Sequence, residues 1–370
     1  MVFTGLNLLY YFLNRTDKVK NDGFFELDKF KKGYYFVKEG NADSYKNYSF
    51  KIYELDEKER ISKPMFFVKQ AKKFDSQSLL DIDAEVRALE IFYKNKVLNT
   101  YIPTLIDADF NNGFIATTYL DGVNLRDYLI GKHRFIGIGK NAESTISSIF
   151  KEMAILLASL HKLPYKNEFA EYTPMPFQLN EEFLNNISKI LKLKNADIVS
   201  KNIPSQLTID NLRAIIPFLK QIDYKKNALI HRDAHFRNFI FRPIHNGFEL
   251  KMIDWEMTSK GDRYWDLAKV LSSLLNIGNN TTDEEKMFIS KIIKQFWNDY
   301  HAISKKKKGE NTILKVINFI VCEKLLRQLE LMLTGEEVDA DKVSEILRFF
   351  QNPKSVVINY INLYDELTSA

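Results

Sequence analysis

The segment that most constrains the fold is a short β-rich stretch, residues 228–254, set among segments with helical periodicity. It carries the string HRDAHFRN at residues 231–238, and a predicted hairpin then leads to a strand over residues 248–253 that ends at Asp254. An Asp and an Asn five residues apart on a tight loop can face one cleft, and a hairpin can return a second Asp opposite them. The order of these residues therefore matters more than any one of them.

This spacing matches what phosphoryl transfer requires. One carboxylate must lie near the acceptor hydroxyl, to orient it and take its proton, and oxygen ligands must hold Mg²⁺ against the nucleotide phosphates. The pattern His-x-Asp-x-x-x-x-Asn, followed by an Asp at a strand end, supplies that set. The His-x-Asp-x-x-x-x-Asn pattern alone also occurs in unrelated chains, and an Asp at a strand end is often only a turn former. The two together are a more specific indication of phosphoryl transfer.

A second pair of charged residues lies upstream. Lys69 ends a predicted strand, and Glu85 follows sixteen residues later on an amphipathic helix. In kinase-type folds such a lysine neutralises the α- and β-phosphates while a helix glutamate holds its ammonium in place. An exposed strand lysine and a helix-surface glutamate would have the same spacing, and the downstream motifs favour the functional interpretation.

The patterns of apolar residues predict an N-terminal part rich in strands and a C-terminal part rich in helices. Alternation and aromatic or β-branched residues predict strands at residues 34–38, 48–55, 64–70, 104–109 and 114–119. Helical spacing predicts helices at residues 4–14, 76–96, 142–161, 208–222, 262–275, 283–303, 312–333 and 342–350. In the helix 76–96 we expect Glu85 to lie away from the apolar stripe that includes Ile82 and Leu89.

The turn between the first two predicted strands, residues 39–47, occupies the place of a phosphate-covering loop. It holds one glycine, Gly40, yet backbone N–H groups and the Ser44 hydroxyl can approach the phosphates, because a nest of amides needs no particular side chain. An ordinary hairpin turn is the alternative for this segment.

Composition narrows the class of protein. The 370 residues are 45% hydrophobic and 27% charged, which is typical of a soluble globular chain with two parts around a cleft. A net charge of +5, from 53 basic and 48 acidic residues, is too weak to indicate nucleic-acid binding. Without an apolar run of about 20 residues or a leader pattern, we expect no membrane span and a cytoplasmic protein. The single cysteine, Cys322, is expected in the core.

Five motifs together resemble the aminoglycoside phosphotransferase and choline kinase family. They are HRDAHFRN at 231–238, MIDWE at 252–256, GDRYWDLA at 261–268, LASLH at 157–161 and YLDG at 119–122. The family pattern runs HGDxHxxN, then IDWE or IDFE, then GDPxxDLA, with an LAxLH element upstream. The resemblance extends from about residue 40 to residue 270.

The resemblance implies an α+β, protein-kinase-like bilobal fold. Its small antiparallel sheet would form a nucleotide-binding N-lobe at residues 31–119, after a helical extension at 1–30. The C-lobe, residues 120–370, would be mainly helical, with a catalytic loop at 228–256 and an acceptor-binding region at 276–370. The nucleotide would bind at a hinge near Thr118 and Leu120.

The resemblance also implies roles for single residues. Asp233 would be the catalytic base or orienting group, Asn238 and Asp254 the Mg²⁺ ligands, and Lys69 with Glu85 the phosphate-clamping pair. Two further residues would support the loop, His231 as scaffold through hydrogen bonds and Asp266 as a buried brace.

Two departures from the pattern concern the catalytic segment: Arg232 replaces the usual glycine, and Arg263 replaces the common proline. Position 235 is His rather than the lysine of Ser/Thr protein kinases, and only six residues separate Asp254 from Gly261, too few for an activation loop. Both features favour the small-molecule group over protein kinases.

The sequence therefore predicts a Mg²⁺-dependent phosphotransferase that moves the γ-phosphate of ATP, or GTP, to a hydroxyl of a small molecule. Two alternatives remain open. One is a kinase-like enzyme that phosphorylates Ser or Thr of a peptide, as in lanthipeptide-type modification, and the other is an inactive nucleotide-binding pseudokinase. Acidic residues in the C-terminal region could meet a cationic acceptor or could simply be solvated: Glu323, Glu330, Glu336, Glu337 and Asp339. The sequence indicates no oligomeric state.

Overall fold

The computed structural model describes residues 7–8, 11, 35–39, 47–55, 61–72, 76–130, 140–164, 168–182, 184–185, 208–278, 282–334, 338–351, 363 and 367–368. The chain forms two compact units. The first unit consists of Met1–Arg134 with Phe236–Thr258, and the second of Phe135–His235 with Ser259–Ala370. The predicted helix at 4–14 and the predicted loop at 39–47, including Ser44, lie largely or wholly outside the described residues.

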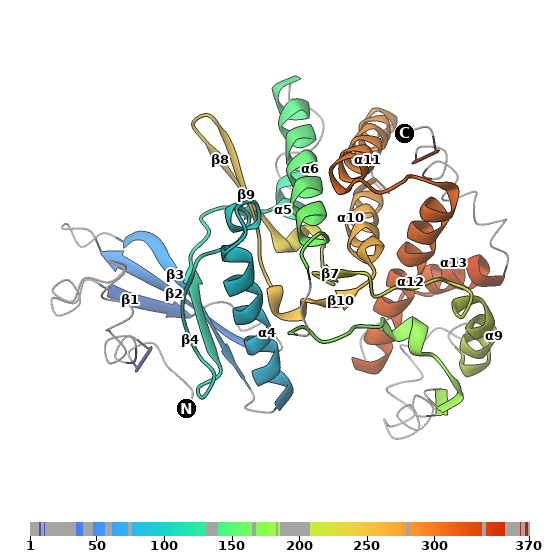
Figure 1. The fold of residues 1–370 in the computed structure, drawn as a ribbon, viewed down its shortest axis with the longest axis horizontal. Coiled ribbons are helices and arrows are strands. Elements are labelled where there is room, and N and C mark those ends of the chain that lie inside the picture. Colours follow the sequence, from blue (N-terminus) through green and yellow to red (C-terminus); the bar gives the residue numbers. More distant parts are fainter. Residues whose placement is uncertain are drawn as a thin grey trace. The chain divides into compact units, whose positions relative to one another are not determined.

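A five-stranded antiparallel sheet is the frame of the first unit (Figure 1). Its order is β1-β2-β3-β5-β4, with β1 at Tyr35–Glu39, β2 at Asn47–Leu55, β3 at Ile61–Ala71, β4 at Leu105–Asp109 and β5 at Phe114–Thr118. Side chains alternate between the two faces of a strand, so Phe66 and Val68 enter the core while Phe67 and Lys69 point to the other face. One face of the sheet is thus packed, and the other is left for a site.

Helix α4, Ser76–Tyr93, packs within the same unit. Its buried stripe includes Ile82, Val86, Leu89 and Phe92, as the spacing predicts, but Glu85 is buried as well. The expectation that Glu85 lies away from this stripe is wrong, because a residue three positions after Ile82 and four before Leu89 shares their face.

A second, smaller sheet explains why residues 236–258 group with the N-terminal segment. Strands β8, Phe239–Ile244, and β9, Gly247–Met252, form the predicted hairpin, and the short β6, Val123–Asn124, pairs with β8. The Met252 N–H also donates to the Tyr101 carbonyl at 2.7 Å. Short helical segments complete the unit: α5 at Leu125–Ile130, η1 at Leu98–Thr100, η3 at Phe236–Asn238 and η4 at Trp255–Met257.

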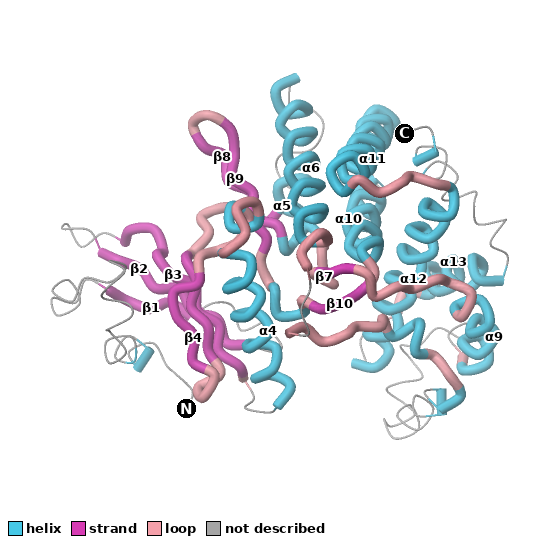
Figure 2. Tube along the Cα trace, viewed as in Figure 1, coloured by secondary structure: helices cyan, strands magenta, loops and turns pink. Residues whose placement is uncertain are grey.

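The second unit is built mainly of helices, as Figure 2 shows. They are α6 at Lys140–Leu160, α9 at Ile209–Leu219, α10 at Arg263–Gly278, α11 at Asp283–Ser304, α12 at Glu310–Thr334 and α13 at Ala340–Gln351, with the short η2 at Met175–Gln178. A two-stranded sheet pairs β7, Ala228–Ile230, with β10, Ser259–Gly261. The one cysteine, Cys322, is buried in α12 as expected.

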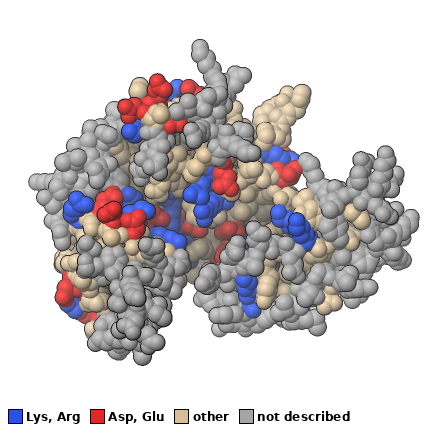
Figure 3. All heavy atoms as spheres, turned by 180° about the vertical axis from the view of Figure 1, so that it is seen from behind, with Lys and Arg blue, Asp and Glu red and all other residues tan. Residues whose placement is uncertain are grey.

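On one face of the molecule, the described surface charges are mixed in sign. On the face drawn in Figure 3, described Lys and Arg side chains lie beside Asp and Glu side chains in small groups. Among the described residues, no helix combines the length and the apolar character needed to cross a membrane.

Candidate active site

A cavity of about 630 Å³ lies on the face of the first unit's sheet that is not packed in the core. Alternate residues of three neighbouring strands line it: Ser49 and Lys51 on β2, Phe67 and Lys69 on β3, and Ile115 and Thr117 on β5. This follows from the pleat of the sheet, because residues two apart on each strand point to the same side. The segment 118–120 and residues 253, 254 and 256 also line the cavity, together with Asn47, Glu85, Pro103, Gly122 and Ile240.

The Lys69 ammonium lies between two carboxylates in this cavity. Its Nζ is 3.1 Å from Glu85 Oε2 and 3.3 Å from Glu85 Oε1, and it also contacts Asp254. The side chains of Lys69 and Glu85 are 13% and 5% exposed, whereas that of Asp254 is 40% exposed. The structure therefore brings together one ammonium, one buried acid and one acid that is open to a ligand.

The electrostatics of this cluster keep Lys69 charged. Burial by itself would lower the pKa of Lys69, but the negative charges of Asp254, Glu85 and Glu256 raise it above its usual value. Burial raises the pKa of Glu85 to about 7, although the neighbouring Lys69 charge acts in the opposite direction. Sequence reasoning did not single out Glu256, which also accepts a hydrogen bond from Asn47 Nδ2 at 3.3 Å.

The two predicted metal ligands, Asn238 and Asp254, belong to adjacent backbone segments of the first unit. The Ile253 N–H donates to the Asn238 carbonyl at 2.9 Å, which fixes the strand end next to η3. Asp254 has a φ of 62°, so the chain turns sharply there and the carboxylate leaves the line of the strand.

Both of these side chains offer oxygen ligands, the type that Mg²⁺ prefers. Among the described residues, no cluster of three or more His, Cys, Asp or Glu side chains could hold a metal by itself.

The predicted hinge residues, Thr118 and Leu120, line the same cavity. The Thr118 N–H donates to the Thr104 carbonyl at 2.9 Å, and the Thr118 Oγ1 accepts from the Thr104 N–H at 3.0 Å. The Tyr119 N–H donates to Met65 at 2.8 Å. These bonds hold the end of β5 in place beside the cavity.

The remaining predicted residues belong to the second unit, where Asp266 holds the loop that carries Asp233. The Asp266 carboxylate, which is fully buried, accepts the N–H of His231 at 2.8 Å and the N–H of Arg232 at 2.9 Å. His161 Nε2 lies 3.1 Å from the same carboxylate, and His161 Nδ1 lies 2.8 Å from the Tyr300 hydroxyl. Burial lowers the pKa of His161, so the neutral ring donates from Nε2 to Asp266 and accepts from Tyr300.

Arg232 occupies the position where the family pattern has glycine, and it has a φ of 72°. The left-handed region that this angle represents favours glycine because a Cβ crowds the following carbonyl. Here the Arg232 carbonyl accepts from Trp265 Nε1 at 3.3 Å, and its guanidinium lies 3.7 Å from the centre of the Tyr172 ring. These contacts hold an arginine in a conformation that glycine adopts more easily.

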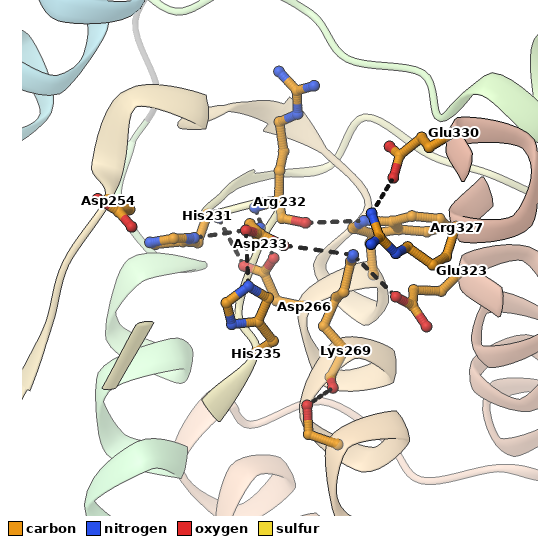
Figure 4. A network of polar contacts seen from close by, with 12 residues as sticks. His231, Arg232, Asp233, His235, Asp254, Asp266, Lys269, Glu323, Arg327 and Glu330 are labelled. Atoms are coloured by element: carbon orange, nitrogen blue, oxygen red, sulfur yellow. Dashed lines mark hydrogen bonds and ion pairs between the residues drawn. The ribbon is translucent and has the colours of Figure 1, made fainter. Parts of the chain in front are cut away.

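Asp233 has polar partners on both carboxylate oxygens (Figure 4). Its Oδ2 lies 3.2 Å from His235 Nε2 and its Oδ1 lies 3.5 Å from Lys269 Nζ. Its backbone N–H donates to His231 Nδ1 at 3.3 Å, the type of scaffold bond expected for that histidine. Burial alone would raise the pKa of Asp233, but the hydrogen bond from His235 and the charges of Lys269 and His235 hold it well below its usual range.

Sequence reasoning missed Lys269, although a signal was present. Lys269 lies three residues after Asp266, and residues three apart share one face of a helix, so a basic residue there can reach the loop that Asp266 holds. On its other side Lys269 contacts Glu323, one of the acidic residues noted in the C-terminal region.

Comparison with known proteins defines the class of this chain. A family model described as the phosphotransferase enzyme family matches residues 46–300, which is more than half of the chain. The chain belongs to the phosphotransferase enzyme family. The family and the enzyme class predicted from the sequence are thereby confirmed.

Solved structures with a similar fold cover nearly the whole chain. An ethanolamine kinase from Plasmodium vivax is 14% identical, with a TM-score of 0.52 over 98% of this chain and 92% of that one. An amicoumacin kinase, in complex with AMP-PNP, Ca²⁺ and Ami, is also 14% identical, with a TM-score of 0.51 over 90% of this chain and 94% of that one. The predicted α+β, protein-kinase-like fold is confirmed. No match was found among curated protein sequences.

Proposed function

We propose that the chain is a Mg²⁺-dependent phosphotransferase that moves the γ-phosphate of ATP, or of GTP, onto a hydroxyl group of a small molecule. The observation that carries this proposal is the buried Lys69 ammonium, held by Glu85 and Asp254 on the wall of a cavity of about 630 Å³. Pockets of roughly 300–1,000 Å³ typically bind ligands of nucleotide size. The segment at Thr118 and Leu120 would contact the base.

The charges of the cavity support a nucleotide bound together with a cation. Three carboxylates, Glu85, Asp254 and Glu256, lie around the Lys69 ammonium, and anionic carboxylates at this position would repel the phosphates of a triphosphate. When bound, Mg²⁺ supplies the positive charge that offsets the phosphates, and Asn238 and Asp254 are the residues that would hold it. Lys69 would bind the α- and β-phosphate oxygens directly.

Asp233 would act on the acceptor. As the acceptor oxygen bonds to the γ-phosphorus, the bond from that phosphorus to the bridging oxygen breaks, the diphosphate keeps the electron pair, and the hydroxyl proton passes to the Asp233 carboxylate. Because the pKa of Asp233 lies below its usual range, the carboxylate is anionic at neutral pH and is a weak base. Its main contribution is then to orient the hydroxyl, which suits a loose transition state.

We propose a small-molecule acceptor rather than a peptide. His235 stands where Ser/Thr kinases have lysine, and only six residues lie between Asp254 and Gly261. The two similar structures are named as kinases of ethanolamine and of amicoumacin. The test below includes Ser/Thr peptides and therefore also decides whether the acceptor is a peptide.

Two measurements test the proposed function. Purified protein is heated with Mg-ATP, Mg-GTP, or either nucleotide with EDTA, and a nucleotide at one hundred times its Kd should add about 2.7 kcal/mol of stability. Nucleotide consumption is then measured with amino alcohols, aminoglycosides, sugars and Ser/Thr peptides. Asp233→Ala should keep the thermal shift and lose consumption, whereas Asp254→Ala should lose the metal-dependent shift.

The control is Asp223→Ala, which removes an exposed carboxylate of the second unit that pairs with Lys225. It should leave both measurements unchanged. Stabilisation without consumption of any acceptor would favour the inactive alternative, and consumption with peptides alone would favour the peptide kinase. Full turnover by Asp233→Ala would reject the assigned role of that residue.

A further inference from the structure

We propose that Lys269 is a positioning residue for the catalytic carboxylate: its ammonium bridges Asp233 to Glu323 on α12 and thereby fixes the orientation and the anionic form of Asp233. This inference rests on the proposed function, because it concerns the group that would orient the acceptor hydroxyl. None of the family motifs in the sequence includes Lys269.

The geometry forms a chain of contacts across three elements of the second unit (Figure 4). From Lys269 Nζ it is 3.5 Å to Asp233 Oδ1 and 3.2 Å to Glu323 Oε1, and the Ser272 hydroxyl donates to Glu323 Oε2 at 3.1 Å. The ammonium cannot shift without losing one of its two carboxylates. Glu323 is in turn held by Ser272, so the position of the ammonium is set by the helices and not by the catalytic loop.

Burial destabilises the charged forms of Lys269 and Glu323 unless each charge has a partner of opposite sign. The Lys269 and Glu323 side chains are 13% and 18% exposed, and a charge taken from water is stabilised only when a partner lies close. Burial alone would lower the pKa of Lys269, but the negative charges of Glu323 and Asp233 raise it, so the ammonium stays charged. One cation is therefore shared by two acids, and Asp233 is the more exposed of these.

Some of the groups that face Asp233 favour its carboxylate anion, and others oppose it. From its own loop come His231 and His235, and from α10 comes Lys269, all of which favour the carboxylate anion. Beyond Lys269, α12 presents Glu323 and Glu330. The negative charges of Glu330 and Asp233 oppose each other, while Arg327 lies beside Glu330. Arg232, the residue before Asp233, stacks on Tyr172. Of the described side chains that pair with the Asp233 carboxylate, Lys269 carries a full positive charge, whereas His235 is charged only when protonated.

The consequence for the reaction is geometric. His235 holds one oxygen of Asp233 and Lys269 the other, so the carboxylate plane is fixed from two sides. An acceptor hydroxyl then meets an anion whose direction is already set, and a misplacement of about 1 Å can reduce a rate by roughly 100-fold. Removal of Lys269 should release one side of the carboxylate and leave Glu323 as an uncompensated neighbour.

The first experiment measures the carboxylate itself by NMR. Protein labelled with [4-¹³C]aspartate is titrated, and the Asp233 signal is identified by its absence in Asp233→Asn. In the wild type we expect no titration of this signal above about pH 4, because a close opposite charge lowers a carboxyl pKa by roughly 1–3 units. Lys269→Met should move the midpoint up by at least about one unit, and Lys269→Arg should not. An unchanged midpoint in Lys269→Met would overturn the inference.

The control is Lys315→Met. Lys315 is equally buried at 13% exposure and pairs with Asp262 at 2.6 Å in the same unit. Its loss should lower the melting temperature without moving the Asp233 signal. If Lys269→Met does not fold, the double variant Lys269→Met/Glu323→Gln is used, because it removes the Lys269 and Glu323 charges together. The inference requires that the titration midpoint of Asp233 in the double variant lie above the midpoint in Glu323→Gln alone.

The second experiment separates positioning from structure by kinetics. With Mg-ATP and the best acceptor of the panel, Lys269→Met should lower kcat by about 10-fold to 100-fold with the KM for ATP unchanged, and Lys269→Arg should recover most of the rate. Equal kcat values in the wild type and Lys269→Met would overturn the kinetic part. If the wild type uses no acceptor, the proposed function fails, while the NMR titration still decides whether Lys269 controls Asp233.

Discussion

The Asp266 carboxylate accepts the backbone N–H of Arg232 at 2.9 Å, at a residue whose φ of 72° is unusual for a side chain of that size. A non-glycine residue in this region costs about 1–2 kcal/mol. The cost is met by the contacts around it, which include the stacking of the guanidinium on Tyr172 at 3.7 Å. The loop that carries Asp233 is thus held in its conformation by its surroundings, and the residue at position 232 adapts to it.

Substitution of Arg232 should separate the backbone strain from the side-chain contact. Arg232→Ala keeps the strained φ and loses the stacking, so we expect the free energy of unfolding to fall by about 1–2 kcal/mol. Arg232→Gly loses the same contact but relieves the strain, and it should be more stable than Arg232→Ala by about 1 kcal/mol. Urea denaturation of the three proteins measures both differences. An alanine variant as stable as the glycine variant would show that no strain is present.

The pH dependence of stability should report the buried Glu85. Its pKa in the folded protein is raised to about 7 by burial, above its ordinary value, so the folded state holds the proton more tightly than the unfolded state does. The stability that this tighter proton binding by Glu85 adds to the folded state is fully present below the ordinary pKa near 4.5. It is lost as the pH rises through about 7. In Glu85→Gln this loss should be absent.

The measurement compares the wild type with Glu85→Gln in EDTA at pH 5 and pH 7.5. The lowered pKa of the buried His161 makes stability rise with pH in part of the same window, so the difference between the two proteins is the informative quantity. We expect the variant to gain stability relative to the wild type as the pH rises. A difference that does not change with pH would contradict the raised pKa of Glu85.

The strands and helices around the site were predictable from the sequence because local patterns set them. Alternation predicted β2 and β5 to within one residue at each end, and the apolar stripe predicted α4, although that helix ends at Tyr93 and not near residue 96. The short strands β6 and β10 were not predicted, and β7 was predicted only as the start of the β-rich stretch at residue 228. Two or three residues carry no period, and the pairing of these strands is decided by distant segments.

The candidate site was predictable only where residue type and spacing coincide. The motifs pointed to Lys69, Glu85 and Asp254, and the structure brings these three together. Glu256 follows no spacing rule, because its importance comes from its position beside the Lys69 ammonium. Lys269 shares a helix face with Asp266, but only the packing of the loop against α10 shows that its ammonium reaches Asp233. The burial of Glu85 was missed because polarity was taken as a sign of exposure, whereas a buried partner, Lys69, compensates its charge.

Gly122 is required by a close approach of two backbones. A Cβ at this position would lie 2.5 Å from the Phe241 carbonyl oxygen, which belongs to β8 and cannot move aside as a side-chain end can. We expect Gly122→Ala to lower the free energy of unfolding by about 1–3 kcal/mol, measured by urea denaturation. The matched control is Gly309→Ala, where a Cβ meets nothing within 4 Å and the stability should stay the same or rise slightly. Equal effects of the two substitutions would rule out the steric explanation.

Lys69→Met should abolish phosphoryl transfer through two effects of one lost charge. In the proposed function the phosphates lose their ammonium partner, and the buried Glu85 loses the cation that lies 3.1 Å away. We expect kcat/KM for Mg-ATP to fall by at least about 100-fold, and the melting temperature to fall more at pH 8 than at pH 5, because Glu85 can take up a proton at the lower pH.

The control is Lys72→Met, which removes a lysine at the end of the same segment whose Nζ lies 5.4 Å from the centre of the Tyr48 ring. Because Lys72 does not line the cavity, its loss should leave kcat/KM unchanged. Lys69→Met/Glu85→Gln should recover much of the stability at pH 8 without recovering activity, since it removes the unpaired buried charge but restores no phosphate partner. Recovery of activity in that double variant would mean that Lys69 serves only to neutralise Glu85, and that the phosphates bind elsewhere.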